Sequence, residues 1–278
     1  MTIVAHITDL HVVLPGRRAY GVVDTAAYLE ALVARLAAQT PRPDLIVATG
    51  DLVDGGKPEE YARLRALLAP LALPLRLIPG NHDDLVALRA AFPERDELRG
   101  ETSHGSWSRE VGGLHVIGLD TAQRGREGGY LDDERLAWLE RALAAQTDRA
   151  TLVLTHHPPF RTGIEHMDVL GFEGADAFAA VIEAHPQVAL VASGHLHRPI
   201  VTRWAGTVAL TVPSAAHQLA LDLEPGAASA FVLEPAAFAL HAFDGERIVT
   251  HYAAIEAAAG PYPFRDPSGA LLAPSDRG

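Results

Sequence analysis

The sequence has no cysteine among its 278 residues, so disulfide bonds and thiolate metal ligands are excluded. Basic residues are also scarce: 23 Lys and Arg stand against 35 Asp and Glu, a formal net charge of −12 with histidine counted as neutral. Because no run of Lys or Arg occurs, a nucleic-acid duplex or an anionic membrane surface would be a poor partner. No apolar stretch reaches the ~20 residues needed to cross a bilayer. We therefore expect a small-molecule substrate, with no nucleic-acid or membrane partner.

Five short polar motifs do occur, each directly after a run rich in Val, Ile or Leu. They are Asp9-x-His11, Gly50-Asp51, Gly80-Asn81-His82-Asp83, Thr155-His156-His157 and Gly194-His195-Leu196-His197. Each motif should lie at the carboxyl end of a strand, where α/β folds place their chemistry. Asp, Asn and neutral His bind divalent cations without thiolates, and a carboxylate can bridge two cations roughly 3.5–4 Å apart. The motifs therefore predict a hydrolytic site with two metal ions.

The spacing within the motifs suggests how the side chains converge. Residues i and i+2 of an extended segment point to the same side, which would bring Asp9 toward His11 and His195 toward His197. A glycine precedes Asp51, Asn81 and His195, and it should let the backbone turn sharply as it leaves the strand.

Each motif taken alone also has a structural interpretation. Gly50-Asp51 is typical of a turn, and residues 81–83 are typical of a turn before the N-cap of a helix that starts near Leu85. Five other histidines are interpreted as core residues satisfied by hydrogen bonds: His6, His115, His185, His241 and His251. The ordered set of motifs, each behind an apolar run, favours the metal site over these separate explanations.

The order DxH, GD, GNHD, a lone H and GHxH resembles the calcineurin-like metallophosphoesterase superfamily. Further segments resemble its class III branch, which holds glycerophosphodiesterases and cyclic-nucleotide phosphodiesterases: Tyr20-Gly21, Arg42-Pro43-Asp44, the segment 57–61, His157-Pro158-Pro159 and His217-Gln218. The resemblance implies that one metal takes Asp9, His11 and His197. It implies that the other takes Asn81, His156 and His195, and that Asp51 bridges the two.

The resemblance also implies a fold and an assembly. The fold is an α/β, four-layer α-β-β-α sandwich with two mixed sheets flanked by helices, and the catalytic domain would cover residues 1–256. Two interpretations of residues 257–278 stay open: a tail that packs on a second subunit of a homo-oligomer, a dimer or higher, and a frayed terminus. A cytoplasmic location is expected, because the first strand begins almost at Met1 and leads directly to Asp9, so that cleavage of a signal peptide would destroy the site.

The expected activity is hydrolysis of small phosphodiesters by in-line attack of a hydroxide held by two divalent cations, which could be Mn, Fe, Zn or Co. His82 is expected to contact a phosphoryl oxygen or to protonate the leaving alkoxide, with Asp83 orienting it. His217 is a second candidate for substrate contact or support, and Tyr20 should hydrogen-bond near Asn81.

The resemblance puts glycerophosphodiesters first as substrates and 3′,5′-cyclic nucleotides second. The 6% aromatic content does not decide between these two substrate classes, although Phe160, Phe172 and Trp204 lie near motif loops. Two other hypotheses are a scaffold protein that has lost catalysis and a nuclease of the same superfamily. The scaffold hypothesis predicts that some of the metal ligands are missing, but all of them are present in this sequence. The nuclease hypothesis fits poorly with the acidic net charge.

Alternating periodicities support one α/β domain with a large core, in line with the 48% hydrophobic content. Strands are predicted over residues 3–8, 45–49, 75–78, 107–110, 114–120, 151–155 and 188–193, and helices over 24–39, 58–68, 84–91, 132–146 and 175–184. Short extended runs from about residue 207 predict a mostly antiparallel closing sheet.

Overall fold

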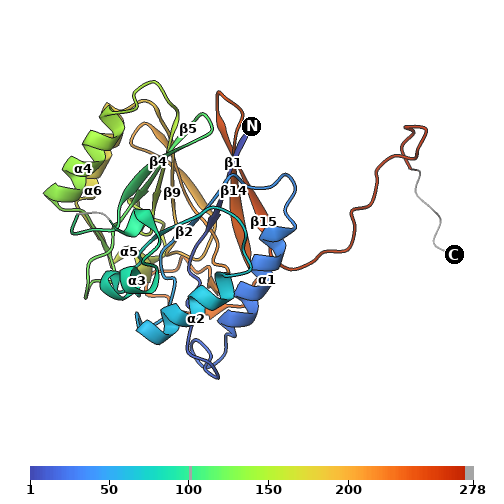
Figure 1. Cartoon of the computed structure of the whole chain (residues 1–278), viewed down its shortest axis with the longest axis horizontal. Helices are drawn as coiled ribbons and strands as arrows, with labels where there is room; N and C mark the ends of the chain where they lie inside the picture. The colour runs from blue at the N-terminus through green and yellow to red at the C-terminus, as the bar shows by residue number, and fades with distance from the viewer. Residues whose placement is uncertain (100–101, 273–278) are drawn as a thin grey trace.

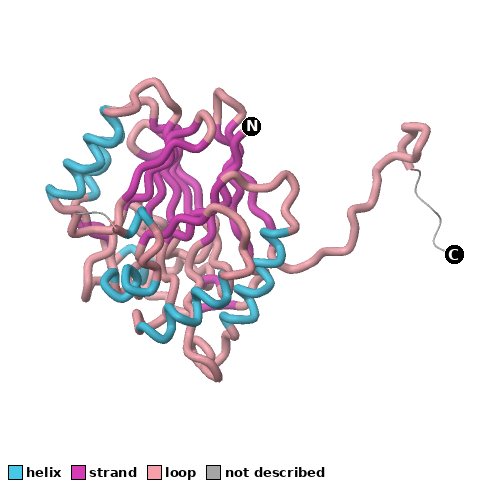
Figure 2. Tube along the Cα trace, viewed as in Figure 1, coloured by secondary structure: helices cyan, strands magenta, loops and turns pink. Residues whose placement is uncertain are grey.

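Two β-sheets pack face to face at the centre of the protein, with helices on both outer sides (Figures 1 and 2). The computed structural model describes residues 1–99 and 102–272. The first sheet has the order β15-β14-β1-β2-β3. Its strands are β1 (Thr2–Ile7), β2 (Leu45–Thr49), β3 (Leu75–Ile78), β14 (Ala237–Phe243) and β15 (Ile248–Ala254).

The second sheet has the order β10-β11-β9-β7-β5-β4. Its strands are β4 (Trp107–Val111), β5 (Leu114–Leu119), β7 (Thr151–Thr155), β9 (Val188–Ser193), β10 (Ile200–Trp204) and β11 (Thr207–Thr211). Two short ladders lie in the loops: β6 (Gly129–Tyr130) pairs with β8 (Phe172–Glu173), and β12 (Gln218–Leu219) pairs with β13 (Phe231–Val232).

Helices cover the outer face of each sheet. The first sheet is covered by α1 (Thr25–Ala37), α2 (Pro58–Leu68) and α3 (Leu85–Ala91), and the second by α4 (Asp133–Ala144) and α6 (Ala175–Ala184). The short elements η1 (Asp96–Leu98) and α5 (Glu165–Asp168) lie in connecting segments. The predicted four-layer α-β-β-α sandwich is therefore confirmed. No helix in the part of the chain that the structure describes is long and apolar enough to span a bilayer.

The local sequence explains these elements. Every residue of β1 and β2 is buried, as expected for parallel strands covered on both faces, and both strands are accordingly rich in apolar residues. Helix α1 buries Leu29, Leu32 and Leu36 on one face, and the Asp24 side chain caps it by accepting a hydrogen bond from the Ala27 amide at 3.2 Å. These elements match the predicted ones to within a few residues at each end.

The prediction of a mostly antiparallel closing sheet is right about the pairing and wrong about the sheet: most pairings of the described C-terminal strands are antiparallel, but the strands do not form one sheet. The C-terminal strands extend the two existing sheets: β11 pairs parallel with β9, and β14 pairs antiparallel with β1. Each of them thereby satisfies its own backbone groups and covers an edge that β9 or β1 would otherwise expose. Strand β10 has only partly buried or exposed residues, which weakens the apolar pattern by which a sequence reveals a strand.

Candidate metal centre

The five motifs meet at one edge of the sandwich. Strands β1, β2 and β3 run parallel, as do β5, β7 and β9, so the loops that follow them leave from the same ends of the two sheets. Backbone hydrogen bonds join successive loops: the amide of Asp9 donates to the Gly50 carbonyl at 3.1 Å, and the amide of His11 donates to the Asp51 carbonyl at 2.8 Å. The amide of Gly194 donates to the His156 carbonyl at 3.0 Å. The structure therefore brings all seven predicted ligands into one region.

The side chains form two adjacent groups of donor atoms. In the first, His197 Nε2 lies 3.3 Å from Asp9 Oδ1 and 3.3 Å from His11 Nε2. In the second, His156 Nε2 lies 3.1 Å from Asn81 Oδ1. The ring of His195 is 5.1 Å from that of His156, measured between centroids.

Asp51 lies between the two groups. Its Oδ2 is 3.6 Å from His11 Nε2, and its Oδ1 is 3.4 Å from His156 Nε2. The side chain is buried, and the His82 amide donates to Oδ1 at 2.9 Å, which fixes the carboxylate plane. Each oxygen thus faces a different group of donors, so this carboxylate is placed to bridge two cations.

The hydrogen bonds of Nδ1 in His156 and His197 leave Nε2 of each ring free to bind a cation. His156 Nδ1 donates to the Thr49 carbonyl at 2.7 Å, and His197 Nδ1 donates to the His217 carbonyl at 2.9 Å. Because a carbonyl only accepts, the proton of each neutral ring is on Nδ1 and the lone pair is on Nε2. The lone pairs of buried Nε2 atoms therefore point into a space that carboxylate oxygens share. The donor set fits two divalent cations.

The charges of the centre support the same conclusion. Burial alone would raise the pKa of Asp9, but His197 holds it well below its usual range, and His156 does the same for the pKa of Asp51. Burial opposes protonation of His156, yet the Asp51 carboxylate raises the pKa of this ring to about 9, so that a bound cation would take the place of a proton on Nε2. Two ionised carboxylates are therefore buried among imidazoles, where a cation would be strongly attracted.

The backbone conformation of the predicted ligands differs from the extended conformation expected from the sequence. Asp9, His11, Asp51, His195 and His197 all have positive φ, between 43° and 65°, so the paired ligands converge through left-handed turns and not through extended backbone. Of the three preceding glycines, Gly50 has a positive φ of 91°. The other two are needed for space instead: a Cβ on Gly80 would lie 2.3 Å from the Asp51 amide nitrogen, and one on Gly194 would lie 1.9 Å from Thr8 Oγ1.

The Gly80→Ala variant should therefore be destabilised by about 1–3 kcal/mol and should bind metal less tightly, because the added methyl group displaces the backbone of Asp51. Denaturant unfolding and metal titration measure both effects. Gly113→Ala is the matched control, since its Cβ would meet only Phe243 at 3.5 Å, an ordinary contact. Equal stability of the two variants would contradict this explanation.

A cavity of about 470 Å³ opens over the centre, and we call it the metal pocket. Residues that line it include His11, Tyr20, Asn81, His82, His217 and Phe231. The His82 ring is half-buried, and its Nδ1 donates to the Asp54 carbonyl at 2.8 Å. His82 Nε2 lies 4.0 Å from Asp51 Oδ2. Burial lowers the pKa of His82, but Asp51 and the Asp54 carbonyl outweigh it and raise the pKa above its usual value.

Asp83 does not orient His82 as the sequence suggested, because its carboxylate is used elsewhere. It accepts hydrogen bonds from the amides of Gly80 at 2.9 Å and Leu52 at 3.1 Å, and from the Tyr61 hydroxyl at 2.9 Å. Burial and the charge of Asp51 raise the pKa of Asp83 to about 6. Asp83 therefore ties the loop after β2 to the loop after β3, while the Asp54 carbonyl orients His82.

His217 and Tyr20 lie on the His11–His197 side of the metal pocket. The His217 ring centroid is 4.5 Å from that of His197, and burial together with His197 lowers the pKa of His217 to about 3, so its ring is neutral. The Tyr20 ring is 53% exposed and lies 5.2 Å from His217 and 5.3 Å from Phe231. The Tyr20 ring thus lies against the rings of His217 and Phe231. Asn81 lines the same pocket.

Asp54 belongs to the site although the motifs did not reveal it. Its Oδ1 lies 3.1 Å from His11 Nδ1, so it directs the other nitrogen of that ring toward the centre. Its only signal in the sequence is its position three residues after Asp51. The Asp54→Ala variant should therefore bind metal about 10–100-fold more weakly, as chelator competition can measure. Asp148→Ala, at an exposed position, is the control, and an unchanged affinity in both variants would contradict the role.

The histidines outside the motifs match their predicted core role in four of five cases. His6 bonds to Thr49 Oγ1 at 2.7 Å and to His241 at 3.2 Å, and His115 bonds to Ser108 Oγ at 2.6 Å. His185 contacts Glu140 at 3.2 Å. The prediction for His251 is wrong, because this residue is exposed on the edge strand β15.

Comparisons with known proteins agree with this geometry. A probable glycerophosphodiester phosphodiesterase GpdQ from Arcobacter nitrofigilis is 38% identical over 272 residues, which cover 97% of this chain and 99% of that protein. The 3′,5′-cyclic adenosine monophosphate phosphodiesterase CpdA from Pseudomonas aeruginosa is 36% identical over 205 residues, covering 74% of this chain and 72% of that protein.

Among solved structures, a dimetal phosphatase from Danio rerio is similar in fold. It has a TM-score of 0.68 at 14% identity and covers 92% of this chain and 96% of that chain. The sequence profile of the family described as calcineurin-like phosphoesterase matches residues 2–199, well over half of the sequence. This chain therefore belongs to the calcineurin-like phosphoesterase family.

Proposed function

We propose that this protein hydrolyses small phosphodiesters with the help of two divalent cations, and that residues 1–256 form its catalytic domain. One cation would be held by Asp9, His11 and His197 and the other by Asn81, His156 and His195, with Asp51 shared. The observation that carries this proposal is the position of Asp51, whose two oxygens lie 3.6 Å and 3.4 Å from His11 and His156 respectively. Mixed nitrogen and oxygen donors suit Mn, Fe, Zn and Co alike.

When bound, such a cation pair supplies Lewis acidity and lowers the pKa of bound water from 15.7 to roughly 7. The residues of the chain do the rest. His82 keeps one proton on Nδ1, bonded to the Asp54 carbonyl, so a second proton on Nε2 would face the metal pocket. From there it can be given to the leaving alkoxide, or it can bond to a phosphoryl oxygen. Asp83 supports this loop from behind, and His217 and Tyr20 are proposed as substrate contacts.

Glycerophosphodiesters are the first substrate class that we propose. The relative from Arcobacter nitrofigilis, which matches almost the whole chain, carries that activity in its name. Cyclic 3′,5′-nucleotides are the second candidate, favoured by the Tyr20 and Phe231 rings, which lie 5.3 Å apart beside the pocket and offer apolar faces to a nucleobase. An inactive scaffold is less well supported, because every residue of the motifs is present.

The test is an assay of purified protein loaded with Mn(II) against bis(p-nitrophenyl) phosphate, with metal content measured on the same sample. We expect turnover well above buffer. Glycerophosphoethanolamine, cyclic AMP and p-nitrophenyl phosphate then rank a diester, a cyclic diester and a monoester. If metal is bound and none of the diesters is hydrolysed, the enzymatic proposal fails.

We further propose that residues 257–278 serve as an oligomerisation segment, of which residues 273–278 lie outside the described part. Figure 1 shows the segment after β15 running away from the body of the protein. Tyr262 and Phe264 in this segment are 76% and 87% exposed, as expected for side chains that a second subunit would cover. Truncation after Glu256 should reduce the number of chains per particle found by light scattering, and an unchanged number would exclude this role. The cytoplasmic location stays a prediction from the sequence.

A further inference from the structure

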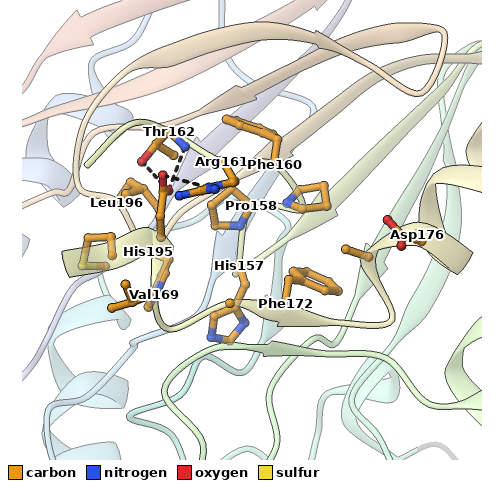
Figure 3. A pocket seen from close by; sticks show the side chains of 15 residues that line it. His157, Pro158, Phe160, Arg161, Thr162, Val169, Phe172, Asp176, His195 and Leu196 are labelled. Carbon is orange, nitrogen blue, oxygen red and sulfur yellow. Dashed lines mark hydrogen bonds and ion pairs between the residues drawn. The ribbon is translucent and has the colours of Figure 1, made fainter. Parts of the chain in front are cut away.

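A second cavity lies beside the metal pocket and is not explained by the metal centre. We call it the side pocket; it has a volume of about 530 Å³ (Figure 3). The loop after β7 and the segment that contains α5 and the start of α6 enclose it. Met167 and His195 line both cavities, so the side pocket begins where the metal pocket ends.

The wall of the side pocket has an apolar part and a polar part, the latter made by His157, Arg161, Thr162, Asp168, Asp176 and His195. Figure 3 shows Pro158, Phe160, Val169, Phe172 and Leu196 around it. This apolar part of the wall suits the hydrocarbon or aromatic part of a ligand. Arg161 provides a charged group at the rim, with its side chain 85% exposed and its Nε 3.6 Å from Asp168 Oδ2.

The shape of the side pocket is fixed by hydrogen bonds within its own wall. The buried carboxylate of Asp168 accepts hydrogen bonds from the amides of Thr162 at 2.8 Å and Gly163 at 2.9 Å. The Phe172 ring stacks on the core residue Phe178 with 6.2 Å between centroids. Because these contacts hold both sides of the wall, a ligand would not have to order the wall on binding.

The two cavities adjoin different sides of the metal centre. Tyr20 and His217 line the metal pocket beside His11, whereas the side pocket reaches only His195 and the neighbour of His156, His157. A phosphodiester differs from a monoester in carrying two organic groups on one phosphorus. With phosphorus over the donor groups, one organic group would extend toward Tyr20 and the other toward Met167 and the side pocket.

We propose that the side pocket is the subsite for the alcohol group that stays on phosphorus when the other leaves, and that this group has an apolar, alkyl or aryl body larger than a methyl group. This inference rests on the proposed function and narrows it: among glycerophosphodiesters, it favours those whose second alcohol group is apolar over glycerophosphoethanolamine. Diesters that fill both cavities are preferred over diesters with one small group and over monoesters.

The test fills the side pocket and compares two diesters that release the same p-nitrophenolate. Ala175, which is half-buried in the wall, is replaced by Trp, and Val169→Trp, at the exposed rim of the pocket, is a second, independent filling variant. For phenyl p-nitrophenyl phosphate we expect kcat/KM to fall by about 10-fold or more. For methyl p-nitrophenyl phosphate it should stay within about 2-fold of the unsubstituted protein. The matched control is Ala34→Trp, on the exposed face of α1.

A binding measurement provides a second readout that does not depend on turnover. Phenylphosphonate and methylphosphonate, titrated calorimetrically into the metal-loaded proteins, should differ in affinity for the unsubstituted protein and lose this difference in both filling variants. A similar change for both diesters, or no change in either, would overturn the subsite. If the unsubstituted protein hydrolyses neither diester although metal is bound, the proposed function fails, and the phosphonate titrations still test the pocket.

Discussion

Replacing Asp51 with alanine should release both cations and lower the rate of phosphodiester hydrolysis by at least about 10³-fold. The expectation follows from the position of this carboxylate, with one oxygen 3.6 Å from His11 and the other 3.4 Å from His156. A cation pair contributes several kcal/mol to stabilising the transition state, and each 1.36 kcal/mol corresponds to a factor of ten in rate. Loss of a single shared side chain thus affects both halves of the site.

Metal content per chain and kcat measured on the same preparation check this prediction. Circular dichroism is needed as well, because Asp51 also accepts a hydrogen bond from the His82 amide, and its loss loosens that loop. Asp148→Ala, at an exposed position, should keep two metals and full activity. If the Asp51→Ala protein is folded and still holds two metals per chain, Asp51 does not bridge them.

The strand ends of the site were predictable because burial on both faces leaves a strong signal. All five residues of β2 are buried, so an apolar run directly precedes Gly50-Asp51 and marks where the chain leaves the sheet. The same holds for β7 before His156. That these strand ends meet could be predicted from one rule: loops at the carboxyl ends of parallel strands lie at the same edge of a sheet.

The details that depend on loop conformation were not predictable in this way. The positive φ of Asp9 and His11 follows from how their loop bonds to the carbonyls of Gly50 and Asp51, which are distant in sequence. The hydrogen bonds of Asp54 and Asp83 have the same origin, since an isolated Asp in a loop has many possible partners. The side pocket is likewise formed by loops, whose apolar residues have no period that a sequence would reveal.

The hydrogen bonds of Asp54 and Asp83 show how the scaffold holds the loop after β3, which carries His82. Asp83 fastens it to the loop after β2 through the Leu52 amide, and Asp54 uses its carboxylate for His11 and its carbonyl for His82. Asp54 thus links the proposed metal ligand His11 to the proposed acid His82. A side-chain substitution at Asp54 should consequently weaken metal affinity through His11 and leave in place the carbonyl that bonds His82, whereas a change at His82 should affect only the reaction.

The His82→Ala variant should keep both metals and lose about 10²–10⁴-fold in kcat, the range expected for a general acid or base. The size of the loss should depend on the leaving group. An alkoxide leaving from glycerophosphoethanolamine needs a proton, while p-nitrophenolate leaves readily without one, so the loss should be much greater for glycerophosphoethanolamine than for bis(p-nitrophenyl) phosphate.

Comparison of these two substrates separates the two proposed roles of His82. The ring lies 4.0 Å from Asp51 Oδ2 and faces the metal pocket, so both a leaving alkoxide and a phosphoryl oxygen are within reach of a bound substrate. Proton donation predicts an unequal loss, because only one leaving group requires the proton. A contact with a phosphoryl oxygen predicts an equal loss for both, because that oxygen is the same in each substrate. Near-normal turnover of glycerophosphoethanolamine at full metal content would exclude both roles, and the leaving group would then have to take its proton from water.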